Sequence, residues 1–122
     1  MATVWITFTR PGFHNWPDAR TILPERGYLS SRHRHLFHVK ITAPVTHDDR
    51  DIEFHDLRDY AESWWPADGE MGSASCEHIA HALAVHVLTR WHNVAWIEVS
   101  VSEDGECGAT VRTTGESSVR DQ

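Results

Sequence analysis

The chain has 122 residues, 40% of them hydrophobic and 24% charged, which is the composition of one soluble globular domain. Its formal net charge of −7 argues against nonspecific binding to nucleic acid or to a membrane surface. No apolar run reaches transmembrane length, the N-terminal residues show no signal-peptide pattern, and two cysteines are too few for a disulfide framework, so we expect a cytoplasmic protein.

The N-terminal third predicts two β-strands. Apolar residues alternate over residues 2–9 and again over about residues 32–45. Between these strands lies a long connection that prolines and glycines interrupt, and a loop of this length inside a compact domain is often functional. His33 and His35 share the parity of the apolar residue Phe37, so both imidazoles are expected on the core face of the sheet.

The middle of the chain predicts two helices. Apolar residues recur at helical spacing from Phe54, and this first helix is expected to stop at Pro66. Ser73 and Ser75 are N-cap candidates for a second, clearly amphipathic helix that continues to Trp91.

Two further strands are predicted near the C-terminus. They are expected within residues 93–103 and at residues 109–114, joined by a hairpin turn at "GECG", residues 105–108. The predicted order is ββααββ, an α+β domain over residues 1–115, followed by a polar tail at residues 116–122.

Histidine is unusually frequent in the chain, with ten residues. His33 and His35 have a candidate third partner in His14, which is expected in the loop after the first strand. Three histidines with an open fourth position describe a catalytic zinc site. Spacing alone leaves a second interpretation open, in which the histidines merely cap one end of the sheet.

Two glutamates are candidate binding residues. Glu103 ends an apolar strand on the core parity, where a carboxylate is costly unless it has a partner. It either holds the edge of a polar ring or turns to solvent. Glu77 lies in the first turn of the second helix, where the helix dipole stabilises a carboxylate, whereas His78 and His81 are expected at the surface.

The order of five motifs resembles the 6-pyruvoyl-tetrahydropterin synthase family, which includes 6-carboxytetrahydropterin synthase of 7-deazaguanine (queuosine-type) biosynthesis. The motifs are the Phe-His pair at His14, "HRHLFHVKI", "IEFHDL", "SCEHIA" and "VSVSEDGECGATV". Over residues 4–112 the resemblance implies a tunnelling fold, ββααββ with a four-stranded antiparallel sheet and two helices on one face. Such chains form homo-oligomers with sites between subunits.

The resemblance also implies a site and an activity. The family's zinc ligands match His14, His33 and His35, with Arg34 where the family has a glycine. The positions that would bind substrate are Ser75, Cys76, Glu77 and Glu103. The implied function is a Zn²⁺-dependent, pterin-forming synthase (a carbon-oxygen lyase) acting on a dihydroneopterin-triphosphate-like substrate.

The chain departs from the family in its acid-base residues. Leu29 occupies the position of the family's catalytic cysteine, and no Asp-His pair is found in a comparable place between Phe54 and Ser75. The possible substitutes are Cys76, His78, Glu25 and Glu70. An alternative function is therefore a tunnelling-fold protein that binds a pterin or purine-like ligand without the family's chemistry.

Overall fold

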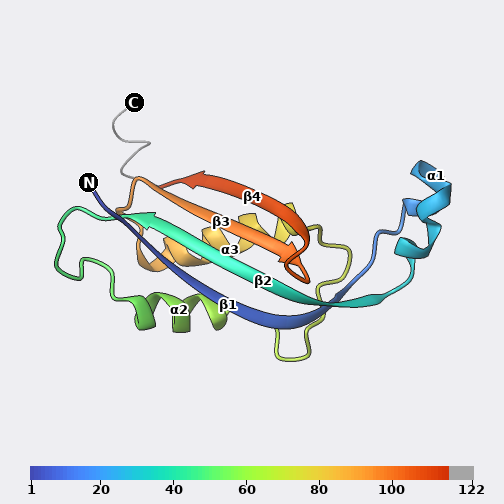
Figure 1. Ribbon diagram of the computed structural model, residues 1–122, viewed down its shortest axis with the longest axis horizontal. Helices are drawn as coiled ribbons and strands as arrows, with labels where there is room; N and C mark the ends of the chain where they lie inside the picture. The colour runs from blue at the N-terminus through green and yellow to red at the C-terminus, as the bar shows by residue number, and fades with distance from the viewer. Residues whose placement is uncertain (116–122) are drawn as a thin grey trace.

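The computed structural model describes residues 1–115, which form a four-stranded antiparallel sheet with two helices, α2 and α3, on one face (Figure 1). The elements are β1 (Thr3–His14), α1 (Ala19–Ile22), η1 (Pro24–Ser30), β2 (His33–Pro44), α2 (Phe54–Glu62), α3 (Cys76–Arg90), β3 (Trp96–Glu103) and β4 (Cys107–Thr114). The strand order is β1-β2-β3-β4. The predicted α+β order and sheet are confirmed, whereas the predicted tail at residues 116–122 lies outside the described residues.

The core lies between the sheet and the two helices. Alternate side chains of β2, such as Phe37 and Ile41, are fully buried in one hydrophobic cluster with Leu83 and Val87 of α3. Complete burial of one such side chain stabilises the fold by about 1.5–3 kcal/mol. Within residues 1–115, no helix is long and apolar enough to span a membrane.

Strand β1 is longer than the sequence predicted. It was expected over residues 2–9, but it pairs with β2 along its whole length and ends with His14 opposite His33. Pro11 is tolerated because β1 is an edge strand, where one side needs no backbone N–H donors. Gly12 fits because a Cβ there would lie 2.8 Å from a ring carbon of Phe37. The expectation that His14 lies in a loop was therefore wrong.

The connection between β1 and β2 projects from the body of the molecule (Figure 1). We call residues 15–32 the arm. The arm contains α1 and η1, which the sequence did not predict. At its base, the backbone N–H of Trp16 donates a hydrogen bond to the carbonyl of Leu29 at 2.7 Å. Its apolar side chains Ile22 and Tyr28 are largely exposed.

Two predicted boundaries needed correction. Helix α2 ends at Glu62 rather than at Pro66, because Ser63 already caps it. The turn between β3 and β4 begins two residues before the predicted "GECG": it spans residues 103–106, and its centre is Asp104 and Gly105, with φ values of 59° and 73°. Successive residues with positive φ are typical of the tight turns that suit the twist of a hairpin, and Asp-Gly is a favoured pair there.

Candidate metal centre

Four side chains from three strands meet at one corner of the sheet. His14 ends β1, His33 and His35 begin β2, and Glu103 ends β3. One ligand atom from each residue can be chosen so that all four lie within 4.8 Å of one another. We call these four residues the His-Glu cluster. Strand pairing brings them together, because His14 is opposite His33 and Glu103 is opposite Phe37, the next core-facing residue after His35.

Each histidine of the cluster is held through its Nδ1 atom. His14 Nδ1 lies 2.9 Å from the carbonyl oxygen of Ala74, and His33 Nδ1 lies 2.9 Å from that of Ser31. His35 Nδ1 lies 2.8 Å from a carboxylate oxygen of Asp104. Because these oxygens only accept hydrogen bonds, each Nδ1 carries a proton, and in the neutral imidazole Nε2 is the atom that can bind a metal.

The Nε2 atoms of His14 and His35 are buried, and neither has a hydrogen-bond partner among the described residues. Glu103 Oε2 nevertheless lies 2.8 Å from His14 Nε2 and 3.5 Å from His35 Nε2. Buried polar atoms without a hydrogen bond are rare and call for an explanation such as a bound ion.

This arrangement fits a zinc ion. Zinc binds histidine nitrogen at about 2.0–2.1 Å in tetrahedral sites, so neighbouring ligand atoms lie roughly 3.4 Å apart. The spacings in the cluster lie on both sides of that value, from 2.8 Å between His14 and Glu103 up to 4.8 Å. Three imidazoles and one carboxylate also match the ligand preferences of zinc. His14, His33 and His35, predicted from the sequence as one ligand set, are thus brought together by the fold.

Asp104 is a site residue that the sequence analysis missed. One carboxylate oxygen accepts from His35 Nδ1 and the other accepts from the backbone N–H of Leu36 at 2.8 Å. The Leu36 N–H first, and then His35, lower the pKa of the Asp104 carboxyl below its usual value. Continued strand alternation would place the Asp104 side chain on the face of the sheet opposite to the cluster. Only the Asp-Gly pair indicated a turn, which returns this side chain to the cluster.

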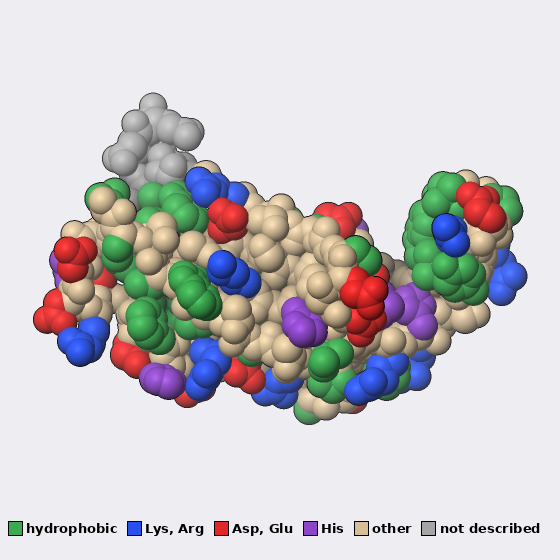
Figure 2. All heavy atoms as spheres, viewed as in Figure 1, with side chains coloured by type: hydrophobic (Ala, Val, Ile, Leu, Met, Phe, Trp, Pro, Cys, Tyr) green, Lys and Arg blue, Asp and Glu red, His purple; other side chains and the backbone are tan. Residues whose placement is uncertain are grey.

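A cavity of about 290 Å³ opens beside the cluster. Its walls come from the base of the arm, the start of α3 and the β3–β4 hairpin. The lining residues are His14, Asn15, Trp16, Leu29, His33, Ser73, Ala74, Ser75, Cys76, Glu77, Glu103, Cys107 and Gly108. Figure 2 shows histidine and acidic side chains close together where the arm leaves the body. All four residues predicted to bind substrate therefore line the cavity.

Two of these residues have additional structural roles. Ser75 is the N-cap of α3, and its Oγ accepts a hydrogen bond from the backbone N–H of His78 at 3.2 Å. Cys76 is buried, and this burial, followed by the nearby carboxylates of Glu103 and Glu77, raises the pKa of its thiol to about 12. A thiol with this pKa is almost fully protonated at neutral pH and is a poor nucleophile.

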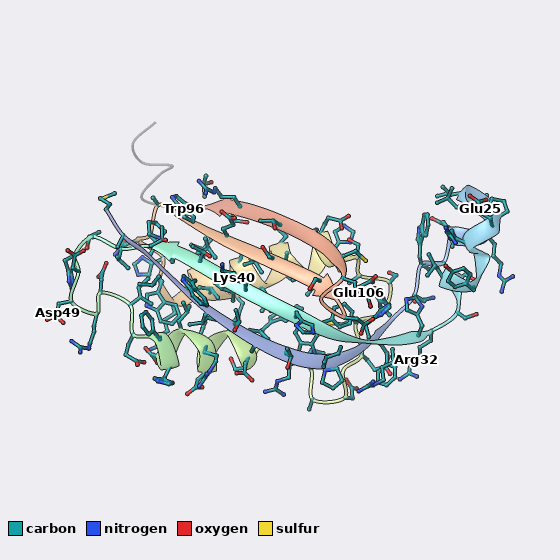
Figure 3. All side chains as sticks on the ribbon, viewed as in Figure 1. Glu25, Arg32, Lys40, Asp49, Trp96 and Glu106 are labelled. Atoms are coloured by element: carbon teal, nitrogen blue, oxygen red, sulfur yellow. The ribbon has the colours of Figure 1, made fainter. Side chains whose placement is uncertain are left out.

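The remaining candidates for proton transfer lie elsewhere. Glu70 forms an ion pair with Arg32 on the surface, and His78 is exposed beside a different groove. Figure 3 labels Glu25 on the arm, far from the β3–β4 turn where Glu106 is labelled. Leu29, at the position expected for the family's cysteine, lines the cavity with an apolar side chain. Within the described chain, none of these residues places a base beside the cluster.

Comparison with known proteins places the fold. No family model and no curated sequence matches the chain. A catalytic-residue variant of 6-pyruvoyltetrahydropterin synthase from Plasmodium vivax superposes with a TM-score of 0.66 at 14% identity, covering 93% of this chain and 98% of that one. The Plasmodium falciparum enzyme gives a TM-score of 0.62 at 12% identity, covering 93% and 99%.

A third similar structure is the dihydroneopterin aldolase of Burkholderia thailandensis bound to guanine, with a TM-score of 0.54 at 16% identity and coverage of 94% and 92%. The chain therefore has the tunnelling fold, as predicted. Its motif resemblance to the 6-pyruvoyl-tetrahydropterin synthase family is confirmed at the level of the fold.

Proposed function

We propose that the chain binds Zn²⁺ through His14, His33 and His35 and takes a pterin or purine-like ligand in the adjacent cavity. The observation that carries this proposal is the orientation of the three imidazoles, each fixed through Nδ1 with its Nε2 left free. Oxygen acceptors that fix Nδ1 in this way are characteristic of metal-binding histidines. The cavity beside them contains carboxylates that can accept hydrogen bonds from ring N–H groups.

The activity that fits best is a pterin-forming synthase resembling 6-carboxytetrahydropterin synthase. Bound zinc would polarise side-chain oxygens of a dihydroneopterin-triphosphate-like substrate and acidify the neighbouring C–H. Glu103 and Glu77 would accept from the amino-pyrimidinone edge of the ring, and the start of α3, with Ser75 and Cys76, would close the pocket around it. The fold similarity to two 6-pyruvoyltetrahydropterin synthases supports this assignment.

A second candidate is a binding protein that keeps the pocket without the family's chemistry. Leu29 on the cavity wall and the high pKa of Cys76 favour it, because neither group accepts a proton near neutral pH. Against it, the similar Plasmodium vivax structure is described as a catalytic-residue variant in which a glutamate is replaced by alanine. A catalytic cysteine is thus not the only solution in proteins of this fold, and this chain has a carboxylate, Glu77, on its cavity wall.

We also propose that the chain forms a homo-oligomer with ligand sites between subunits. Strands β1 and β4 are the edges of the sheet, and their unpaired backbone groups are a template for pairing with another chain. Ile22, Leu23 and Tyr28 expose apolar surface on the arm, where a second copy can cover it. Light scattering at micromolar concentration should give a mass above that of one chain, and a monomer would count against this assembly.

The test of the main proposal combines metal analysis with ligand binding. Protein purified without chelator and supplied with zinc should contain about one zinc per chain. Calorimetric titration with neopterin, guanine and 7-deazaguanine derivatives should show binding of at least one of them, and mass spectrometry should identify any co-purified ligand. Turnover of dihydroneopterin triphosphate would favour the synthase, and binding without turnover would favour the second candidate. Absence of both metal and ligand binding would refute both functions.

A further inference from the structure

Glu103 faces two environments at once. Its carboxylate lies against His14 and His35 in the cluster, and its side chain also lines the cavity that is proposed to take the ring. The side chain is only partly buried, with 27% of it exposed. It is therefore placed to serve the metal, the ring, or each of them in turn.

The contact between Glu103 and His14 is short, and its nature depends on what lies between the two atoms. Oε2 and Nε2 lie 2.8 Å apart, within hydrogen-bonding range, yet His14 Nε2 has no hydrogen-bond partner. With Nδ1 bonded to the Ala74 carbonyl, a neutral His14 places the Nε2 lone pair beside a carboxylate oxygen. Two acceptors at this distance repel each other unless a cation lies between them, and that cation is either a proton on His14 Nε2 or a metal ion that both atoms bind.

Resting on the proposed zinc site, we infer that Glu103 is the fourth protein ligand of the metal when the cavity is empty. The metal is then held by three imidazoles and one carboxylate, which is the closed coordination of a structural zinc site rather than the open one of a catalytic site. A substrate oxygen reaches the metal only when Glu103 moves aside or when the metal accepts a fifth ligand.

The cavity offers Glu103 an alternative partner. A ring edge with two N–H donors forms charge-assisted hydrogen bonds with a carboxylate, and these are stronger than bonds between neutral groups. Ring binding therefore competes with the metal for Glu103 and opens a coordination position. Because such coupling is reciprocal, a ring ligand weakens zinc binding by the same factor by which zinc weakens ring binding.

The experiment compares Glu103→Gln with Glu106→Gln. Glu106 lies in the same hairpin, is exposed and does not line the cavity, so its variant controls for the loss of one acidic residue there. Zinc affinity is measured by competition with a chromogenic chelator, and Co²⁺-substituted protein reports coordination through its visible absorption. We expect Glu103→Gln to bind zinc more weakly by at least roughly 100-fold, with an altered cobalt spectrum, because changing even a residue that only supports a ligand costs 10- to 100-fold.

Folding is checked by the melting temperature of the metal-free proteins. Metal-free Glu103→Gln should melt no lower than metal-free wild type, because the amide can donate a hydrogen bond to His14 where the carboxylate could not. On addition of zinc, the melting temperature of Glu103→Gln should rise less than that of wild type. If Glu103→Gln keeps wild-type zinc affinity and cobalt spectrum, the inference is wrong and Glu103 serves the ring alone, while the proposed function stands. If wild type binds no zinc, the inference and the zinc-dependent function fail together.

Discussion

The two halves of the cavity differ in how their side chains are placed and in what they can do. On one side, the cluster residues stand on paired strands, and each histidine is fixed by a hydrogen bond through Nδ1. On the other side, Leu29 and Cys76 present an apolar side chain and a protonated thiol. The first half has the side chains that could hold a metal ion, and the second half contributes shape but little acid-base chemistry.

This difference has a physical origin. Metal ligands must converge within a fraction of an ångström, and the register of a sheet with a buried face fixes such positions firmly. Residues at the base of the arm and in the connection before α3 are constrained by fewer backbone hydrogen bonds, and loops tolerate substitution, insertion and deletion. Histidines at the positions that match the family's zinc ligands are accordingly present in this chain, whereas no match to its cysteine or its Asp-His pair is found.

The largest expected effect is on metal content. The double variant His33→Ala/His35→Ala removes two of the three imidazoles and should contain no stoichiometric zinc under conditions where wild type contains about one per chain. His38→Ala is the matched control, because His38 is on the same strand but on the exposed face. Elemental analysis measures both, and zinc retained by the double variant would show that the cluster is not the binding site.

The reactivity of the Cys76 thiol in the second half of the cavity can be measured by chemical labelling. In metal-free protein at pH 8, we expect Cys107, which is exposed, to react with a thiol reagent roughly 100-fold faster than Cys76, because Cys76 is buried and its pKa is raised to about 12. The Cys107→Ser variant should lose the fast phase. A fast phase that persists in this variant would show that Cys76 is reactive and available for proton transfer.

The same raised pKa makes a prediction about stability. In the folded chain the Cys76 thiol stays protonated at pH values above its unfolded pKa. The contribution of the protonated thiol to the stability of the fold is therefore complete below the unfolded pKa. This contribution is lost as pH rises from about 9 toward about 12. A Cys76→Ala variant should therefore lose less stability than wild type over this range, as measured by urea unfolding at each pH.

A smaller effect is expected from the residue that supports His35. Asp104→Asn keeps the size of the side chain but weakens the acceptor for His35 Nδ1, so zinc affinity should fall by about tenfold. Asn also tolerates the positive φ of the turn, which separates this effect from backbone strain. Chelator competition gives the ratio, and unchanged affinity would mean that Asp104 serves only the hairpin.

The smallest effect concerns Ser75. Replacing its capping hydroxyl in Ser75→Ala should destabilise the fold by about 1 kcal/mol, which is roughly a fivefold change in the unfolding equilibrium. Zinc content should not change, because Ser75 is outside the cluster. Loss of ring binding beyond the loss of stability would show that the hydroxyl also contacts the ligand.

The sheet and its buried face were predictable because alternation is a strong signal. The parity of Phe37 placed His33 and His35 on the core face, and the structure confirms that placement. The length of β1 was not predictable, since Pro11 and Gly12 normally interrupt a strand. Their tolerance depends on the edge position of β1 and on the ring of Phe37, which are properties of the assembled fold.

The candidate site was predictable in its histidines and only partly in its carboxylates. Parity left Glu103 either on the core side or turned to solvent, but no pattern indicated that its carboxylate lies 2.8 Å from His14. The supporting acceptors could not be found from residue types, because the carbonyls of Ser31 and Ala74 belong to the backbone. Asp104 was hidden by a turn whose position was misjudged by one or two residues.

The tight turn at Asp104 and Gly105 makes metal content a reporter of strand alignment. Adjacent residues of a strand point to opposite faces, so a slip of β3 by one residue against β2 would withdraw Glu103 from the cluster and present a neighbour in its place. Asp104→Gly keeps the positive φ of the turn but removes the bond from the backbone N–H of Leu36 in β2 to the Asp104 carboxylate, so it tests how firmly the turn fixes this alignment. A population that retains helical content but divides into zinc-binding and zinc-free molecules would reveal two coexisting alignments, which bulk measurements of unfolding would average together.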